Sequence, residues 1–475
     1  MTRGRDAIAI LGSRAASRLA RARGYSGTSL PGLVGERLAP GITRRLAMDL
    51  GPITVVSGTN GKTTTSRLLA SILAGAGHRV VANPSGANLA QAISTALTAR
   101  ADLTGAGLRR AGGYGVFEVD EAALPRIASE MAIAQLVLTN LFRDQLDRFG
   151  ETNEVVRLWG LVLAGLPSEA RVIYCADDPR LAALATLVAS GRADAHGYGL
   201  AGPVPSTNVG ELTPEATSCP RCAATLSVDW VVVGHLGSYR CPACGFARPE
   251  PWLTVRVVGS SGFAGQTLGF RWSDAEGAEA EQVVTVRLVG TGNAYNAAAA
   301  VAAAVGLGVD QETAVALLAD ASGPFGRFET LELDGRHVVL SLVKNPASLD
   351  EVTRVGTGAT ADAVLFAVND TFADGRDVSW YWDVNPAALV TGRVFAISGS
   401  RAADLLVRLK YQLLDDPGLE LPGLIGVFDR PSEGLARLVA ATPPGGTILI
   451  VATYTALLGL RAELAARGLV HAMPT

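Results

Sequence analysis

Short apolar runs, each closed by glycine or a polar turn, alternate with helix-like sequence over the first half of the chain. The runs that we predict as buried strands in this half are 53–58, 113–120, 133–140 and 170–178. Each is followed by sequence that favours a helix. Strands that alternate with helices in this way form a largely parallel sheet covered by helices. The pattern therefore predicts an α/β domain.

The pattern changes twice further along the chain. Residues 203–251 contain turns, cysteines and short alternating stretches, which is typical of a small insertion. Beyond the insertion we predict three strands, at 252–259, 267–274 and 282–290, followed by an Ala-rich helix at 293–308. A second alternating region then contains the predicted strands 337–343, 363–370, 394–399, 424–429 and 447–454. We therefore expect an N-terminal helical segment at 1–50, a central α/β domain at 51–330 and a smaller α/β domain at 331–475.

Composition narrows the class of protein. The 475 residues are 48% hydrophobic and 18% charged, which fits a globular protein, and the net charge of −3 gives no overall basic field for nucleic acid. No apolar run reaches the length of a membrane-spanning helix. The Arg-rich N-terminus lacks the apolar centre of a secretory signal, so we expect a cytoplasmic protein. Two interpretations remain for this segment: a surface helix that packs its Ala/Ile/Leu face on the domain, and a contact of its arginines with the inner face of the plasma membrane.

A glycine turn after the first strand carries the strongest chemical signal. The turn and the helix start that follows it consist of Gly58, Thr59, Asn60, Gly61, Lys62, Thr63 and Thr64. Such a turn lets backbone N–H groups surround phosphate oxygens at the positive end of a helix. Lys62 is expected to reach the phosphates of a nucleotide, and Thr63 to bind Mg²⁺. From these residues alone, an ATP-using enzyme and a nucleotide-gated switch both remain open.

Four cysteines of the insertion form two close pairs. Cys219 and Cys222 make the first C-x₂-C pair, and Cys241 and Cys244 make the second. Each pair can hold two corners of a tetrahedral ion, and four thiolates leave no open position for chemistry. We therefore predict a structural zinc ribbon in a reducing compartment, with free thiols or a disulfide pair as the alternative. Cys175 stands apart in a strand and is predicted to be core.

Several motifs resemble those of Mur ligases, which activate a carboxylate as an acyl phosphate and join an amine to it. The turn "GTNGKTTT" resembles their phosphate loop, and "FEVDE" places Glu118 where they hold a Mg²⁺-binding glutamate. The segment "GTGNAYNAAAA" resembles one whose asparagines face the nucleotide, here Asn293 and Asn296. "GRFE" carries Arg327, which matches an arginine that contacts the ATP phosphates. Singly, each of these residues has an ordinary alternative as a surface charge or a helix cap.

Two features depart from ordinary Mur ligases. The stretch "TNLFRDQLDRFG" has Gln145 where those enzymes have a metal-binding histidine, although Asp144 and Asp147 lie nearby in sequence. No lysine occurs between Lys62 and Lys344, so the carbamoylated lysine that holds Mg²⁺ in those enzymes has no counterpart. A second Mg²⁺ site is therefore left open.

Over essentially the whole chain, the motifs resemble the MurT family, the ATP-using subunits of lipid II isoglutaminyl synthase. The resemblance rests on the zinc pattern, "KNPA", "NDTFADGRDVSW" and "SGSRAADLLVRLK". It implies a ligase that uses ATP, Mg²⁺ and structural zinc to amidate the α-carboxylate of D-glutamate in the lipid II stem peptide. It also implies a heterodimer with a GatD-like glutaminase, which releases ammonia from glutamine and forms its contact with residues 331–475.

The resemblance further implies that an aspartate of this chain supports the Cys–His pair of the glutaminase. We assign this role to Asp377, with Asp374 as the second choice, and count Asp377, Lys62 and Glu118 as catalytic. Two other functions remain open. One is a stand-alone amino-acid ligase of the Mur or folylpolyglutamate type, and the other is a nucleotide-regulated scaffold protein of the cell-wall machinery.

Overall fold

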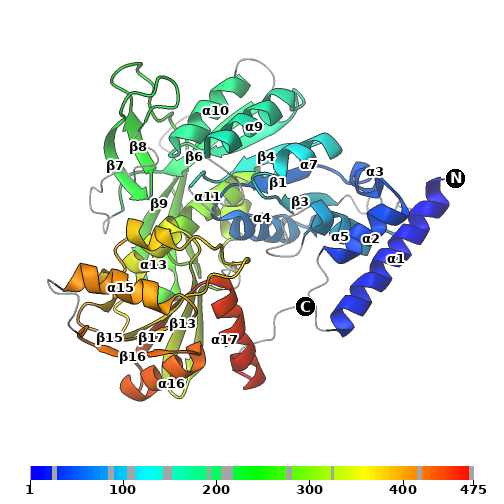
Figure 1. Ribbon diagram of the computed structural model, residues 1–475. Helices are drawn as coiled ribbons and strands as arrows, with labels where there is room; N and C mark the ends of the chain where they lie inside the picture. The colour runs from blue at the N-terminus through cyan, green and yellow to red at the C-terminus, as the bar shows by residue number, and fades with distance from the viewer. Residues whose placement is uncertain are drawn as a thin grey trace.

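Two α/β sheets and a small hairpin make up the computed structural model (Figure 1). It describes residues 2–23, 29–83, 90–103, 113–142, 152–189, 194–204, 218–273, 281–321, 326–414 and 420–469. In spatial order, the strands of the first sheet are β11 (Gln282–Val286), β10 (Gln266–Trp272), β9 (Leu253–Ser260), β6 (Asp194–Leu200), β5 (Arg171–Cys175), β4 (Gln135–Leu138), β1 (Ile53–Ser57), β3 (Tyr114–Glu118) and β2 (Val80–Ala82).

The first sheet is parallel from β2 to β9, and antiparallel pairing joins β10 to β9 and β11 to β10 at one edge. Every residue of β1 is buried, as a central parallel strand covered on both faces requires. The helices of this part are α4 (Lys62–Gly75), α5 (Ala90–Arg100), α7 (Leu124–Glu130), α9 (Thr152–Gly165), α10 (Pro179–Ala189), α11 (Thr291–Gly306), α12 (Gln311–Ala316) and the short η2 (Gly262–Ala264). The predicted α/β class is confirmed.

The Ala-rich helix α11 lies at the centre of this domain (Figure 1). Twelve of its residues, from Asn293 to Ala304, are buried. A helix that is apolar around its whole circumference is typical of such a position, and alanine lets neighbouring elements approach closely. α11 packs against α4, β5, β6 and β9, so it connects the phosphate loop with the far half of the sheet.

The second sheet has the order β12 (Arg327–Leu333), β13 (Arg336–Leu342), β17 (Thr447–Ala452), β14 (Ala363–Ala367), β15 (Val394–Ser398) and β16 (Leu424–Phe428). β12 pairs antiparallel with β13, and the other pairs are parallel. Its helices are α13 (Pro346–Gly358), η3 (Ser379–Asp383), α14 (Ala387–Val390), α15 (Ala402–Leu413), α16 (Pro431–Ala441) and α17 (Tyr454–Ala466). The predicted strands of the last third are therefore confirmed, and β12 is an additional one.

The N-terminal segment forms α1 (Thr2–Ala22), α2 (Leu30–Leu38) and α3 (Ile42–Met48), which pack beside α5 at the edge of the molecule (Figure 1). α1 buries Ala9 and Ile10 and is joined to α5 by a 2.7 Å hydrogen bond between the hydroxyls of Ser13 and Thr98. It therefore packs on the domain, as the first of the two interpretations predicts. Among the described helices, none is long and apolar enough to cross a membrane.

Candidate functional site

The glycine turn lies between β1 and α4 and is packed tightly on its neighbours. Gly58 has a φ of 140°, and a Cβ there would lie 2.0 Å from the hydroxyl of Thr139. Gly61 has a φ of 87°, and a Cβ there would lie 2.0 Å from the side-chain oxygen of Asn296. Both positions therefore require glycine, because any other residue would be strained and would collide. The turn has the form of a phosphate-binding loop.

Lys62 begins α4 and is buried among acidic side chains. Its Nζ lies 3.0 Å from Oε2 of Glu121 and 3.6 Å from Oδ1 of Asp120, and it also donates to the carbonyl of Gly58. Burial alone would lower the pKa of Lys62, but the charges of Glu121, Asp120 and Glu118 outweigh burial and raise it. Lys62 is therefore a fixed positive charge beside the loop.

The two residues predicted to bind Mg²⁺ come from separate motifs and meet in the structure. The hydroxyl of Thr63 lies 2.9 and 2.8 Å from the two carboxylate oxygens of Glu118. They meet because β3, which ends at Glu118, pairs with β1, which leads into the loop. Hydroxyl and carboxylate oxygens are ligand types that Mg²⁺ accepts. The pair could therefore hold this ion beside a bound nucleotide.

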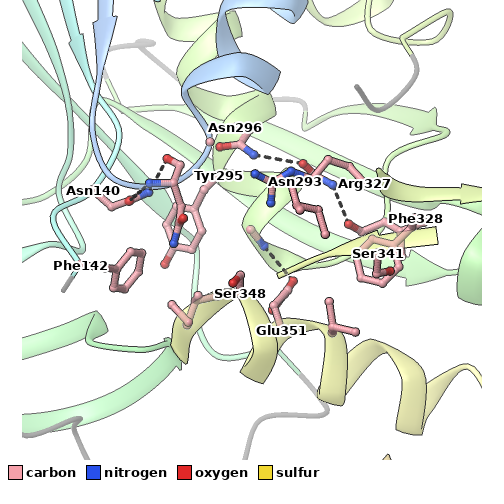
Figure 2. A pocket seen from close by; sticks show the side chains of 18 of the residues that line it. Asn140, Phe142, Asn293, Tyr295, Asn296, Arg327, Phe328, Ser341, Ser348 and Glu351 are labelled. Carbon is pink, nitrogen blue, oxygen red and sulfur yellow. Dashed lines mark hydrogen bonds between the residues drawn. The ribbon is translucent and has the colours of Figure 1, made fainter. Parts of the chain in front are cut away.

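A hollow of about 660 Å³, part of it open to solvent, adjoins the loop. Figure 2 shows side chains from several elements converging on it. The residues that line it are Asn60, Gly61, Asn140, Phe142, Val233, Leu236, Val289, Gly292, Asn293, Tyr295, Asn296, Gly326, Arg327, Phe328, Ser341, Leu342, Ala347, Ser348, Glu351 and Val352.

Five of the predicted nucleotide-binding residues line this hollow. They are Asn60, Gly61, Asn293, Asn296 and Arg327. The others, Gly58, Thr59, Lys62, Thr63 and Thr64, belong to the loop and the first turn of α4 but are not among the lining residues. Three motifs that lie far apart in the sequence thus line one hollow, and the fourth motif joins them through the contact of Glu118 with Thr63.

The second domain closes the site from the other side. Nζ of Lys344 donates to the carbonyl of Thr59 at 3.1 Å, and the amide of Asn345 donates to the side-chain oxygen of Asn60 at 3.1 Å. Glu351 of α13 accepts a 3.0 Å hydrogen bond from the N–H of Gly292 at the start of α11. The second domain therefore touches both the phosphate loop and α11, and the hollow lies between the two domains.

The four predicted metal ligands face one another in the insertion. Sγ of Cys219 lies 3.6 Å from that of Cys244, Sγ of Cys222 lies 3.5 Å from that of Cys241, and all four atoms lie within 4.8 Å of one another. Zn–S bonds of ~2.3 Å in a tetrahedron place sulfurs about 3.8 Å apart. The cluster therefore has the dimensions of a four-thiolate metal site.

Two segments of the chain match models of ligase families. Residues 56–221 match the Mur ligase middle domain, and residues 342–457 match the MurT ligase C-terminal domain. The chain is 30% identical over 458 residues to the lipid II isoglutaminyl synthase subunit MurT of Streptococcus pneumoniae, covering 94% of each chain. It is 29% identical to the MurT subunit of Staphylococcus aureus, covering 85% of this chain and 87% of that one.

The chain belongs to the MurT family.

Solved structures share its fold. A pseudomurein peptide ligase type C from Methanothermus fervidus has a TM-score of 0.63 at 20% identity, covering 88% of this chain and 79% of that one. MurF from Acinetobacter baumannii also has a TM-score of 0.63, at 16% identity, covering 91% and 80%. The fold is therefore that of the Mur ligases, as the motifs predict.

The matched C-terminal segment includes the loop that carries both candidate aspartates. Asp374 is buried, and its carboxylate accepts hydrogen bonds from the backbone and hydroxyl of both Thr371 and Thr455, at 2.6 to 3.1 Å. Asp377 is exposed, and its Oδ1 accepts a 2.8 Å bond from the N–H of Ser379. Asp374 thus fixes the loop internally, while Asp377 presents its carboxylate at the surface.

Several residues of the site are not predicted by the sequence motifs. Glu121 lies three positions after Glu118 in the same motif, where a second acidic residue was a usable signal. Lys344 and Asn345 belong to "KNPA", a recognised stretch without an assigned contact. Tyr295 lies between the two predicted asparagines on α11. The predicted Gln145, Asp144 and Asp147 lie outside the described residues.

Proposed function

We propose that this protein is an ATP-dependent carbon–nitrogen ligase of peptidoglycan synthesis. In this proposal it converts the α-carboxylate of D-glutamate in the lipid II stem peptide to the amide of D-isoglutamine, using ammonia from a glutaminase partner. The observation that carries the proposal is the convergence of Lys62, the Thr63–Glu118 pair and Arg327 on one loop, in a chain of the MurT family.

The chemistry requires ATP because a carboxylate has no good leaving group. Transfer of the γ-phosphoryl group to the carboxylate gives an acyl phosphate and ADP. Ammonia then attacks the acyl carbon, phosphate leaves, and an amide forms. Phosphoryl transfer depends mainly on positioning and charge neutralisation, so we assign Lys62 and Arg327 to the phosphates. Asn293 and Asn296 lie at the start of α11, where they are assigned to the nucleotide.

Two metal ions belong to the proposal. Mg²⁺, held by Thr63 and Glu118, would neutralise phosphate charge during transfer. Zinc, held by the four cysteines, would be structural, because a closed four-thiolate sphere has no open position.

We further propose that the glutaminase binds the face of the second domain around Asp377. Large apolar side chains are exposed on the segments around it: Phe372 (67%) and Trp382 (48%) flank Asp377 in the chain, and Tyr411 (63%) has its ring 6.0 Å from that of Trp382. Aromatic residues are enriched at the centres of protein interfaces. An exposed carboxylate among them could orient the imidazole of a partner's Cys–His pair and stabilise its charged form.

The lipid substrate implies a reaction at the cytoplasmic face of the membrane, and α1 supports such a location. Ile8, Leu11 and Leu19 share one face of α1 and are 60, 53 and 53% exposed. The same helix carries five arginines and one aspartate. An exposed apolar stripe beside basic residues suits the surface of an anionic bilayer.

Mass spectrometry of lipid II tests the reaction. Lipid II is incubated with the protein, ATP, Mg²⁺ and an ammonium salt, and replacement of OH by NH₂ lowers its mass by about one unit. We expect this product with the wild-type protein and none with Lys62→Ala. ATP binding without product, even after addition of a GatD-type glutaminase and glutamine, would favour the scaffold alternative. ATP turnover with free amino acids would favour the stand-alone ligase.

The partner role is tested in the same assay with glutamine as the nitrogen source. Asp377→Asn should reduce glutamine-dependent amidation at least tenfold and leave ammonium-dependent amidation unchanged. Glu332→Gln, a replacement of an exposed carboxylate on the edge strand β12 of the same sheet, is the matched control and should change neither. Equal loss with both nitrogen sources would contradict the assignment of Asp377.

A further inference from the structure

One wall of the hollow comes from the cysteine-rich insertion. Val233 ends β7 (Ser227–Val233) and Leu236 begins β8 (Leu236–Arg240), and both side chains line the hollow. Phe142 and Tyr295 line it as well. Phosphates require the N–H groups of the glycine turn, so these apolar and aromatic side chains remain for the base of the nucleotide. The hairpin β7–β8 thus belongs to the site and is not a separate appendage.

The tip of the hairpin is fixed to the central domain. Nε2 of His235 lies 3.0 Å from Oδ2 of Asp178, and both side chains are fully buried. Gly234 packs directly on the ring of Phe142, where a Cβ would lie 2.6 Å from Cε1. The two pocket residues of the hairpin flank this fixed tip, so their positions depend on it.

A shared carboxylate connects the insertion with α11. Asp177 accepts a 2.7 Å bond from Nε of Arg248, which follows the second cysteine pair. The same carboxylate accepts a 2.5 Å bond from the hydroxyl of Tyr295, which lines the hollow. The N–H of Gly237 in β8 donates to the carbonyl of Asp177 at 3.0 Å. A displacement of the insertion would therefore disturb this side of α11.

The other end of the hairpin is the cysteine cluster. Cys241 follows β8 directly, and Cys222 precedes β7 by a short turn. The second domain also reaches the hairpin, because Arg354 of α13 donates to the carbonyl of Val232. β7 and α13 lie in contact on the side where the two domains meet (Figure 1). An isolated two-stranded hairpin is marginally stable, and the stability of small ribbons depends on their metal.

We propose that the metal-loaded ribbon is a working part of the nucleotide site: its hairpin forms the wall for the base, and metal occupancy sets nucleotide affinity. This inference rests on the proposed function, since it requires that the hollow holds ATP. It goes beyond that function by giving the insertion a binding role. The cysteines act at a distance, as positioning residues for Val233 and Leu236.

Two variants of one strand test the wall. Val233→Ala removes two methyl groups from the hollow, and Val228→Ala removes the same groups from β7 at a position that does not line it. We expect the Kd of Mg·ATP and of Mg·ADP, measured by calorimetry on the full chain, to rise about three- to tenfold in Val233→Ala alone. Competition by tripolyphosphate, which has no base, should be unchanged in both variants.

Metal removal tests the coupling. A chelator, and separately Cys222→Ser, should lower the metal content measured by mass spectrometry and raise the Kd of Mg·ATP at least tenfold. Zinc added back should restore the affinity of the chelated wild-type protein only. If the metal-free protein binds Mg·ATP with the wild-type Kd, metal occupancy does not set nucleotide affinity. If the two valine variants have equal Kd values, the hairpin does not form the wall for the base.

The measurements distinguish an error in the proposed function from an error in the role given to the ribbon. If the wild-type protein binds no Mg·ATP, or if Lys62→Ala binds it normally, the proposed function is wrong. If the wild-type protein binds Mg·ATP and Lys62→Ala does not, while Val233→Ala matches Val228→Ala, only the inference about the ribbon is wrong.

Discussion

Replacing Glu121 by glutamine removes the closest negative charge from Lys62 and tests the electrostatics of the loop. Both side chains are less than 10% exposed, and their charged atoms lie 3.0 Å apart. Loss of one partner of a buried pair typically destabilises a protein by about 3–5 kcal/mol. Asp120 remains 3.6 Å from the ammonium, so we expect a smaller loss of about 2–3 kcal/mol in the free energy of unfolding. This corresponds to a fall of roughly 5–10 °C in Tm for a domain of this size.

The effect should depend on pH in a defined direction. Burial alone would raise the pKa of Glu121, but Lys62 and Lys344 outweigh burial and lower it. A carboxyl group with a lowered pKa stabilises the fold above its usual pKa, and this contribution is lost as the pH falls through the lowered value. The difference in Tm between wild type and Glu121→Gln should therefore be constant from about pH 6 to 8 and shrink below about pH 4.

Differential scanning fluorimetry without nucleotide measures the effect. The control is Glu154→Gln, which removes a carboxylate 2.7 Å from Arg157 on the exposed face of α9 and should leave Tm unchanged. If Glu121→Gln also left Tm unchanged at pH 7, or if its effect persisted undiminished at pH 3.5, the buried ion pair would not have the role described for it.

Three further changes have defined outcomes. Ala223→Gly should raise the stability of the ribbon against chelator-induced unfolding by about 1 kcal/mol, because Ala223 has a φ of 60°, where glycine is unstrained. Gly61→Ala should abolish Mg·ATP binding in calorimetry with an unchanged far-ultraviolet circular dichroism spectrum, since the new methyl would meet Asn296. Asn345→Ala should lower Tm by the equivalent of about 1 kcal/mol, because Asn345 caps α13, and should also weaken Mg·ATP binding through its lost contact with Asn60.

The local sequence pattern was sufficient to predict most of the strands and the phosphate loop. Buried parallel strands are continuous apolar runs, so 53–58 and 447–454 were predictable, and both correspond to central strands of the two sheets. The two cysteine pairs were predictable for a similar reason, because the ligands of one ion recur at a fixed spacing. By contrast, β12 follows a glycine and alternates charged with apolar residues, and its edge position is set by tertiary pairing.

Contacts between distant segments could not be predicted in the same way. Nothing in the sequence around Val233 indicates that it lines a hollow beside Asn60, because the contact depends on how the insertion docks. That docking uses Asp177 and Asp178, two adjacent acids after β5 that resemble an ordinary solvent-exposed turn in sequence. Their burial is possible because residues from other parts of the chain pair with them: Arg248 and Tyr295 bind Asp177, and His235 binds Asp178. Burial of charge is therefore a property of the assembled fold.

The charges around the phosphate loop also predict how Glu121→Gln changes nucleotide binding. Lys62, Lys344 and Arg327 supply three positive charges close to Glu118, Asp120 and Glu121, which supply three negative ones. ATP without metal would add about four negative charges to this neutral group, and Mg²⁺ would cancel two of them, so the wild-type protein should bind Mg·ATP much more tightly than free ATP. Glu121→Gln leaves one positive charge in excess. It should therefore gain more in Tm from free ATP than the wild type gains, although its Tm without nucleotide is lower. A smaller gain than that of the wild type would mean that the phosphates do not approach Lys62.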